Sequence, residues 1–418
     1  MTNTANTAIT TTTDTTTSDT TKTGATKADT TTTDTTKTGA TKADATTSAA
    51  GADTPTTHAT SLFQPARLGA LELANRLVMA PMTRTRAAAD GVPQPIMATY
   101  YAQRASAGLI IAEAATPNAV GRTYANIPAI HTAEHVAGWR RVTDAVHAAG
   151  GRMYLQLQHG GRVGHPENSG LHPVAPSPVA LPEAVHTPSG PQEAVVPREM
   201  TVAEIRETVA DFAAAARNAV AAGFAGVEVH AANGYLLHQF LARNTNRRTD
   251  AYGGPVENRV RFVVEVVRAV AEAIGAERVG VRVSPGVTVN GIEEGDTEEI
   301  YRALLGELAG EGLAYLHVVF ADPQSPLFQE IRKTWDGVLI GNPVLGWGGP
   351  LPEDGGRSAG ERLLAAGVDL VSYGRGFLAN PDLVERLRTG APLNPVRGGL
   401  MYASGAEGYT DYPVLAAE

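Results

Sequence analysis

Residues 226–235, Gly-Val-Glu-Val-His-Ala-Ala-Asn-Gly-Tyr, join an alternating run to a turn. The two valines alternate with Glu228 and His230, which is the pattern of a β-strand with one apolar and one polar face. Asn233 and Tyr235 follow the point where the strand stops. Taken alone, these residues could be a core histidine, a turn asparagine and a packing tyrosine. The alternative is that one strand end delivers three polar side chains to a functional site.

Outward from this stretch, short apolar runs alternate with helical patterns such as Thr201–Ala222 and Asn258–Ile274. The candidate strands are Leu77–Met82, Leu109–Ala114, Arg152–Gln158, Gly226–His230, Arg278–Ser284, Tyr315–Val319, Gly337–Gly341 and Leu370–Gly374. Eight strand–helix units predict an α/β fold with a single (β/α)8 TIM barrel. An open doubly wound sheet could hold such strands too. However, no strand leads into the Gly-x-Gly-x-x-Gly turn of a dinucleotide-binding fold.

Strand parity indicates which side chains face the barrel lumen. In residues 153–158 the aliphatic side chains share one face and the polar ones, including Gln156, share the other. We expect the aliphatic set to face the helices and the polar set to face the lumen. Gln156, His230 and Arg282 then lie near the C-terminal rim, where barrel enzymes build their sites. An ion pair with Glu228 is an alternative role for Arg282.

Two segments outside the strands have predictable places. Pro65–Arg76 alternates around Gly69 like a hairpin, and this hairpin could cover the bottom of the barrel. Gly160–Arg198 is a Pro-rich excursion on the predicted catalytic side. Loops of this length in a compact domain are usually functional, so we expect a lid over the site.

Residues 1–60 differ in composition from the rest of the chain. They contain 28 threonines, no aromatic residue and almost no large aliphatic residue. The sequence of Asp19–Asp29 recurs unchanged as Asp34–Asp44. Such a segment cannot bury enough apolar surface to offset its ordering entropy, so we predict a disordered tail before a barrel domain at residues 61–418. Deleting the tail should leave activity intact.

Composition excludes several classes of protein. The chain has no cysteine, which excludes disulfides, thiolate metal sites and a cysteine nucleophile. Lys333 is the only lysine after residue 60 and falls at a predicted helix end, so a buried Schiff-base lysine is not expected. A formal net charge of −9 argues against a nucleic-acid partner. No apolar run reaches the ~18 residues of a membrane span, and we expect a soluble, cytoplasmic protein.

Five short stretches are the most specific in the chain. They are Ala80–Arg84 (APMTR), Tyr100–Arg104 (YYAQR), Asn246–Gly254 (NRRTDAYGG), Glu257–Arg259 (ENR) and Gly405–Pro413 (GAEGYTDYP). In this order they resemble the signatures of the Old Yellow Enzyme family, the FMN-dependent ene-reductases. The resemblance runs from about Leu62 to Leu415 and leaves out the tail. It implies a TIM barrel with FMN across its mouth and NAD(P)H as electron donor.

The resemblance also implies roles for residues at the rim. Thr83 would hydrogen-bond the flavin C4 carbonyl, which places the chain in the branch with threonine rather than cysteine there. Ala114 would contribute backbone contacts, and Gln156 would bind the pyrimidine edge. Arg282 would face N1 and the C2 carbonyl, where negative charge accumulates on reduction. By analogy with oxyanion donors, a fixed guanidinium there is worth roughly 2–4 kcal/mol.

The phosphate of FMN has an expected place of its own. Loops after the seventh and eighth strands commonly build the phosphate sites of barrels. Here they contain Gly341 and Asn342, and Gly374 and Arg375. Backbone N–H groups and the Arg375 guanidinium could hold a dianion, and the resemblance places the phosphate there. Because Asn342-Pro343 interrupts a run that is often Gly-rich in the family, the individual donors stay open.

For the chemistry, the resemblance implies that His230 and Asn233 hold the carbonyl or nitro oxygen of an electron-poor alkene. These donors withdraw electron density and make the β-carbon a better hydride acceptor. Tyr235, with an ordinary phenol pKa of about 10, would protonate the α-carbon from the opposite face. Tyr124 and Tyr402 would shape the substrate site, although either could be a packing aromatic.

Besides Asn342-Pro343, two residues depart from the commonest family pattern, and other functions stay open. Asn233 is a known family variant of the second oxygen donor, alongside His. Gln158 stands where many members carry a bulky Trp, which suggests a roomier or more polar pocket. An FMN-dependent nitro-ester reductase or isomerase could use the same pocket. A non-redox aldolase or metal hydrolase is disfavoured by the lysine count and by histidine spacing. The expected partners are small electron-poor alkenes, with no nucleic acid or membrane, for a monomer or homodimer.

Overall fold

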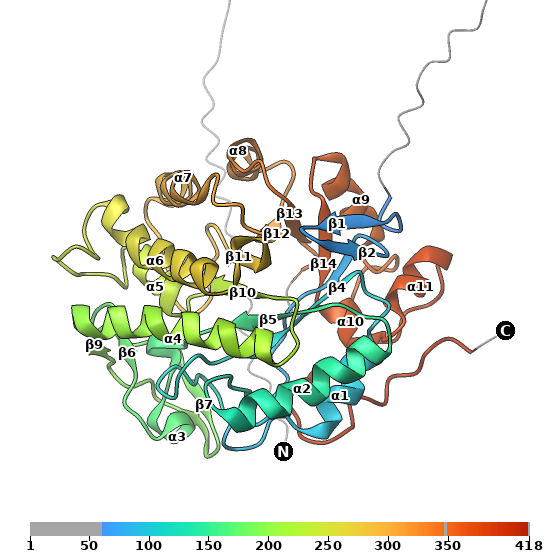
Figure 1. Cartoon of the computed structure of the whole chain (residues 1–418), viewed down its shortest axis with the longest axis horizontal. Helices are drawn as coiled ribbons and strands as arrows, with labels where there is room; N and C mark the ends of the chain where they lie inside the picture. Colours follow the sequence, from blue (N-terminus) through green and yellow to red (C-terminus); the bar gives the residue numbers. More distant parts are fainter. Residues whose placement is uncertain (1–60, 347–348, 417–418) are drawn as a thin grey trace, which may run out of the picture. The chain divides into compact units, whose positions relative to one another are not determined.

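The barrel consists of eight parallel strands in the order β10-β11-β12-β13-β14-β3-β4-β5. In the computed structural model, residues 61–346 and 349–416 are described, and the predicted tail at residues 1–60 lies outside them. The strands are β3 Leu77–Met79, β4 Leu109–Ala115, β5 Met153–Leu157, β10 Gly226–Ala231, β11 Val279–Val283, β12 Tyr315–Ala321, β13 Leu339–Pro343 and β14 Leu370–Tyr373. Parallel pairing of β10 with β5 closes the ring. Figure 1 shows these strands at the centre with helices around them. The prediction of a TIM barrel is confirmed.

The strand ends differ from the predicted bounds by one to a few residues. The first barrel strand was expected to reach Met82, but β3 ends at Met79. Pro81 has no N–H to donate, so the ladder cannot continue through it. At the other side of the barrel, β12 runs on to Ala321 and β13 to Pro343. These extensions lengthen the rim next to the candidate site.

The helices pack outside the barrel. They are α1 Pro95–Ala102, α2 Ala133–Ala148, α3 Pro166–Ser169, α4 Val202–Ala221, α5 Leu236–Leu241, α6 Val256–Ile274, α7 Thr297–Leu308, α8 Pro326–Thr334, α9 Arg357–Ala365, α10 Arg375–Ala379 and α11 Leu383–Thr389. The start of α4 is fixed by a capping box, because the Thr201 side chain accepts from the Glu204 N–H and Glu204 reaches back to Thr201. Such a cap is worth about 1 kcal/mol. None of the helices in the described residues is both long and apolar enough to cross a bilayer.

The predicted strand parity is confirmed by what lies on each face. The valines of β10 and β11 belong to the core between the barrel and its helices. On the lumen side, Gln156 Nε2 donates to Glu228 Oε1 at 2.8 Å, and Glu228 Oε2 lies 2.8 Å from His317 Nδ1. His317 Nε2 in turn lies 2.7 Å from Ser372 Oγ. We call these four buried residues the lumen network.

The N-terminal end of the barrel is closed by a hairpin, as predicted. Its strands are β1 Ala66–Leu68 and β2 Leu71–Leu73, paired antiparallel. Gly69 lies between them with φ of +56°, a conformation that glycine adopts without strain. Leu68 and Leu73 pack against the lumen residues at the bottom of the barrel. The opposite end of the barrel is thus the one left for a site.

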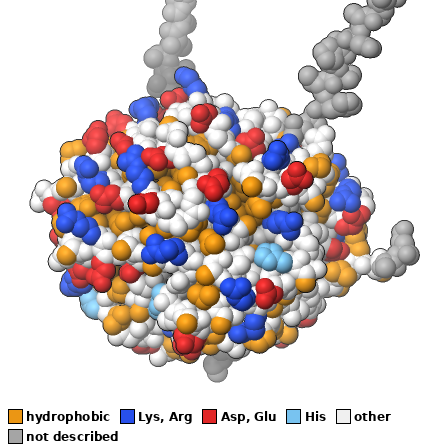
Figure 2. All heavy atoms as spheres, viewed as in Figure 1, with side chains coloured by type: hydrophobic (Ala, Val, Ile, Leu, Met, Phe, Trp, Pro, Cys, Tyr) orange, Lys and Arg blue, Asp and Glu red, His pale blue; other side chains and the backbone are white. Residues whose placement is uncertain are grey.

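The surface of this domain carries both signs of charge. Figure 2 shows basic and acidic side chains interspersed on the face that it presents, rather than gathered into one patch of a single sign. Hydrophobic side chains are scattered among them, which is usual for a protein surface.

Candidate active site

A cavity of about 790 Å³ opens at the C-terminal ends of the barrel strands. Eleven of the thirteen residues predicted for the site line this cavity. They are Thr83, Tyr124, Gln156, His230, Asn233, Tyr235, Arg282, Asn342, Gly374, Arg375 and Tyr402. Because they come from strands or loops throughout the barrel, only closure of the barrel could bring them together.

The other two predicted residues are not among those lining the cavity. Ala114 lies near the end of β4 and is 6% exposed. Gly341 lies in β13, and a Cβ built on it would meet Leu363 and Val368 in the helical layer. A side chain at position 341 would therefore point away from the lumen. Only the backbone of Gly341 could face the site. For both residues a contact with FMN stays a prediction.

Asn233 and Tyr235 are delivered by a left-handed turn that follows the end of β10. Asn233 has φ of +55° and Gly234 has φ of +76°. The helix α5 begins only at Leu236. Asparagine and glycine are the residues that tolerate this conformation best. We call these two residues the Asn233–Gly234 turn.

His230 lies at the end of β10 with its ring centre 5.2 Å from that of Tyr235. Burial, with a contribution from the nearby Arg282 guanidinium, lowers the pKa of His230 well below its usual range. The imidazole is therefore neutral at ordinary pH. His230 Nδ1 and Asn233 Oδ1 are buried and have no hydrogen-bond partner among the described residues. A neutral imidazole and a carboxamide can each donate one hydrogen bond to a substrate oxygen.

Arg282 supplies a buried positive charge at the cavity floor. No ion pair joins it to Glu228 within the described part of the chain, since Glu228 is bonded by Gln156 and His317 instead. Burial lowers the pKa of Arg282, whereas the Glu228 carboxylate raises it, and an arginine stays charged under these conditions. Arg282 Nε is buried without a partner in residues 61–346 and 349–416. The guanidinium can thus serve an acceptor that enters the cavity.

Tyr235 and Tyr124 form a pair of hydroxyl groups in the cavity wall, 3.3 Å apart. Burial raises the pKa of Tyr235 well above its usual value, and Tyr124 raises it further. The prediction that Tyr235 is an ordinary phenol with a pKa of about 10 is therefore wrong. Desolvation disfavours the phenolate, so Tyr235 keeps its proton throughout the working range of pH.

The ends of β13 and β14 and the loops that follow them bring three of the predicted phosphate residues, Asn342, Gly374 and Arg375, to the cavity. Arg375 opens α10, and its Nη2 donates to the Gly346 carbonyl at 3.0 Å. Asn342 Nδ2 donates to the Ser372 carbonyl at 2.9 Å. These contacts hold the two loops beside each other. One N–H of the Asn342 carboxamide is thereby used by protein, which leaves its second N–H, backbone groups and Arg375 as the candidates for an anion.

The long excursion contributes to one wall of the cavity. It contains β6 Val174–Ala175, β7 Val185–Thr187, β8 Gly190–Gln192 and β9 Arg198–Glu199. His186 and Thr187, from the hairpin of β7 and β8, line the cavity. The buried Val163, Leu181 and Val185 pack against Tyr124 and Tyr235. The expected lid is therefore a short hairpin next to the two tyrosines.

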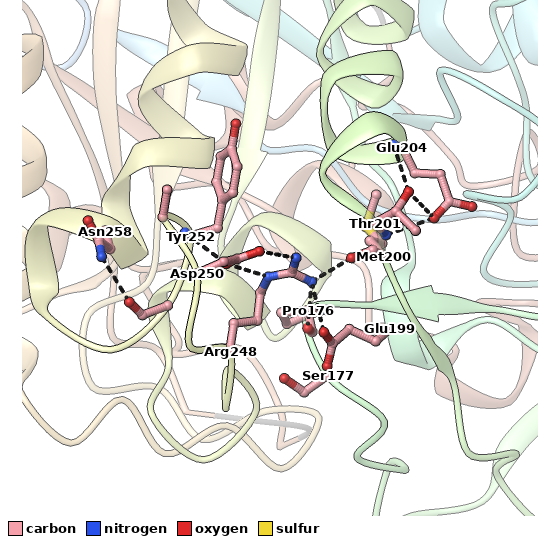
Figure 3. Close-up of polar contacts among 12 residues, drawn as sticks. Pro176, Ser177, Glu199, Met200, Thr201, Glu204, Arg248, Asp250, Tyr252 and Asn258 are labelled. Carbon is pink, nitrogen blue, oxygen red and sulfur yellow. Dashed lines mark hydrogen bonds and ion pairs between the residues drawn. The ribbon is translucent and has the colours of Figure 1, made fainter.

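One arginine bonds the chain on both sides of the β7–β8 hairpin, at Pro176 and at Met200, as Figure 3 shows. Arg248, whose side chain is 3% exposed, donates to the carbonyls of Pro176 at 3.1 Å and Met200 at 2.6 Å. It also bonds both carboxylate oxygens of Asp250, at 3.0 and 2.5 Å. The planar guanidinium can satisfy all these acceptors at once, which an ammonium group cannot.

Sequence reasoning missed several residues of the cavity wall. Thr85, Asn126 and Phe320 line it with φ of +53°, +54° and +52°. A left-handed threonine or phenylalanine cannot be read from sequence, because neither residue favours that conformation. Met82 and Met401 also line the cavity, and their positions beside Thr83 and Tyr402 were the only available signal.

Comparisons with known proteins identify the family. A family model described as "NADH:flavin oxidoreductase / NADH oxidase family" matches residues 61–394. The chain belongs to this family. It is 42% identical over 366 residues to the "Probable flavin mononucleotide-dependent alkene reductase" of Leishmania infantum, covering 85% of this chain and 97% of that protein.

Solved structures agree with this membership. Morphinone reductase in complex with tetrahydroNAD is similar, with a TM-score of 0.79 and 45% identity over 85% of this chain and 98% of that one. The old yellow enzyme homologue of Zymomonas mobilis gives a TM-score of 0.80 and 40% identity, over 85% and 100% of the two chains. The predicted Old Yellow Enzyme membership, FMN dependence and ene-reductase class with a nicotinamide donor are thereby confirmed.

The residues of the cavity fit FMN. Among the lining residues, Thr83, Gln156 and Arg282 offer the polar groups that a flavin ring requires, and the orphaned Arg282 Nε lacks an acceptor. Gly374 and Arg375, at the end of β14, offer groups suited to a phosphate. The apolar Met82 and Leu345 lie in the wall of the same cavity. Cofactor pockets typically combine apolar walls with a few placed polar groups of this kind.

Proposed function

We propose that His230, Asn233 and Tyr235 carry the alkene-reducing chemistry of this ene-reductase. His230 and Asn233 hold the carbonyl or nitro oxygen of an activated alkene and withdraw electron density from its C=C bond. Bound FMN, reduced by NAD(P)H, would supply the hydride to the β-carbon. The proposal is supported by the neutral state of His230 and by the position of both side chains on the cavity wall.

Tyr235 delivers the proton to the α-carbon in this proposal. Its raised pKa keeps the phenol protonated, and its hydroxyl lies 3.3 Å from that of Tyr124. The Tyr124 hydroxyl, within hydrogen-bond reach of Tyr235, would hold the phenol in place beside the substrate. Tyr124 and Tyr402 also bound the substrate, and Tyr402 is 65% exposed at the cavity mouth.

The remaining site residues hold the cofactor. Thr83, Ala114, Gln156 and Arg282 would contact the flavin ring. The phosphate would be held by Gly341, Asn342, Gly374 and Arg375. One N–H of the Asn342 side chain bonds the Ser372 carbonyl, so its second N–H and its backbone are the groups left for the phosphate. The charge of Arg282 would stabilise negative charge at the pyrimidine end of the ring in a site shielded from water.

The observation that carries this assignment is a single cavity lined by the buried Arg282, by His230 beside it on the neighbouring strand, and by Asn233 and Tyr235. The test is the visible absorption spectrum of the purified protein, followed by anaerobic titration with NADPH and then with 2-cyclohexen-1-one. We expect a flavin spectrum that bleaches with NADPH and returns with the enone. A colourless protein that FMN cannot reconstitute would overturn the assignment. Product analysis separates reduction from isomerisation and from nitro-ester cleavage.

Several finer features are proposals as well. We propose small electron-poor alkenes as substrates, no nucleic-acid or membrane partner, a monomer or homodimer, and a cytoplasmic location where reduced nicotinamide is supplied. We also propose that residues 61–418 are the catalytic domain and that residues 1–60 are dispensable for it.

A further inference from the structure

The Asn233–Gly234 turn is bonded by a histidine outside the cavity. The Gly234 N–H donates to His238 Nδ1 at 3.0 Å. His238 lies on α5 and is fully buried. Because Nδ1 accepts this bond, the ring proton of the neutral imidazole is on Nε2. His238 thus connects to the peptide group between the two residues proposed for substrate binding and proton transfer.

The orientation of His238 is fixed in turn by a buried carboxylate. His238 Nε2 lies 2.7 Å from Glu294 Oε1, and the two side chains are 0% and 1% exposed. Glu294 also accepts from the Tyr301 hydroxyl at 2.6 Å and from the Gly286 N–H at 2.9 Å. Burial raises the pKa of Glu294, but these hydrogen bonds outweigh it and leave the pKa below its usual value. The ionised carboxylate therefore selects the tautomer in which Nδ1 is free to accept.

The turn needs such support because its conformation is unfavourable. Asn233 is a non-glycine residue at positive φ, a strained conformation that persists only where the surroundings hold it. Its N–H donates to Ser284 Oγ at 2.8 Å. Its carbonyl accepts from Asn290 Nδ2 at 2.8 Å. The Gly234 carbonyl accepts from Gln239 Nε2 at 2.7 Å. The His238 bond completes a set in which both peptide N–H groups and both carbonyls of the turn are satisfied.

We propose that His238 and Glu294 are positioning residues for the Asn233–Gly234 turn. They set the orientation of the Gly234 peptide, and through it the separation of the Asn233 carboxamide from the Tyr235 hydroxyl. This proposal rests on the proposed function of Asn233 and Tyr235. Neither His238 nor Glu294 lines the cavity, so their effect reaches the substrate only through the turn.

Two substitutions of His238 separate this role from a general structural one. In His238→Asn, the amide oxygen lies about where Nδ1 was and can still accept from Gly234, but the side chain no longer reaches Glu294. In His238→Gln, the amide reaches the position of Nε2 and can still bond Glu294, but Gly234 loses its acceptor. Both variants are polar and uncharged, so they differ mainly in which bond they keep.

The main readout is the affinity of the oxidised, flavin-loaded protein for 4-hydroxybenzaldehyde. It is measured by titration, from the change in flavin absorbance. Its phenolate oxygen offers His230 and Asn233 a charged acceptor. We expect His238→Gln to weaken binding about tenfold or more and to slow flavin reoxidation by 2-cyclohexen-1-one, because small displacements of a site are costly. We expect His238→Asn to stay within about threefold of the parent protein. Equal affinities in all three proteins, or a larger loss in His238→Asn, would overturn the proposal.

Two further variants distinguish a loss of positioning from a general loss of stability. Thr208→Val removes a buried hydroxyl that donates to the Glu204 carbonyl at 2.8 Å within α4, and it lowers stability away from the turn and its supporting residues. We expect it to bind 4-hydroxybenzaldehyde like the parent protein. Glu294→Gln keeps the shape of the side chain but loses its charge, and we expect a loss of affinity similar to that in His238→Gln. Flavin content and enone reduction by the parent protein test the proposed function separately, so the two failures are distinguishable.

Discussion

The Asn233–Gly234 turn and the hairpin of β7 and β8 contribute to the same cavity but are held in different ways. The turn is bonded at every peptide group by side chains that are mostly buried. The hairpin is held at its base, where Arg248 bonds the carbonyls of Pro176 and Met200, and by apolar contacts of Val185. The comparison teaches that the proposed chemistry lies on the rigid element. The hairpin is held by contacts nearer the surface, which include those of Asn168 with the His186 carbonyl and of Thr187 with Glu167.

The largest effect should follow from removing the proton donor on the turn. We expect Tyr235→Phe to slow flavin reoxidation by alkenes with weakly acidic α-positions about a hundredfold or more, because general acid catalysis is lost. Reduction of the flavin by NADPH should change little. Stopped-flow absorbance measures both half-reactions. Equal slowing of the two would show that Tyr235 shapes the pocket rather than donating a proton.

The next effect should come from the base of the hairpin. Arg248→Lys keeps the charge but cannot bond two carbonyls and a carboxylate together, and we expect the free energy of unfolding to fall by about 2 kcal/mol. The two ends of the excursion should separate more often, which would speed proteolysis within residues 183–194. Urea unfolding and limited proteolysis measure these changes. If proteolysis of the excursion were unchanged, the anchor would lie elsewhere.

A smaller effect is expected at the tip of the hairpin. The His186 side chain is exposed, and the backbone carbonyl of His186 accepts a hydrogen bond from Asn168 Nδ2 at 3.0 Å. His186→Ala should therefore change KM for an enone by about twofold and leave kcat unaltered, the usual scale for an exposed side chain. Steady-state kinetics with several enones would check this. A large loss of kcat would place His186 in the chemistry and contradict the comparison.

The smallest effect should be that of pH on the alkene half-reaction, which depends on His230 and Tyr235 on either side of the turn. The pKa of His230 is lowered and that of Tyr235 is raised, so His230 stays neutral and Tyr235 stays protonated. The alkene half-reaction should vary less than about twofold from about pH 6 to about pH 9. Burial raises the pKa of Glu113 to about 7, so an inflection abolished by Glu113→Gln would belong to that residue. An inflection abolished by Tyr235→Phe would contradict the assignment.

Much of the fold and the membership of the site could be predicted from the sequence. Alternation in β10 and β11 fixed which side chains face the lumen, because neighbouring residues of a strand point to opposite faces. The count of strand–helix units then implied the barrel, and closure brings strand ends together at one rim. His230 and Arg282, opposite each other in the register of β10 and β11, follow from that logic alone.

What the sequence alone determined was thus the periodicity, the architecture and the residue types at the rim. The tertiary structure decided the left-handed conformation of Asn233, the raised pKa of Tyr235 and the partners of Glu228. It also joined His238 to Glu294 across 56 residues of sequence. The reason is that parity and turn preference act over a few neighbouring residues. Desolvation and hydrogen-bond satisfaction depend instead on which distant segments exclude water from a group.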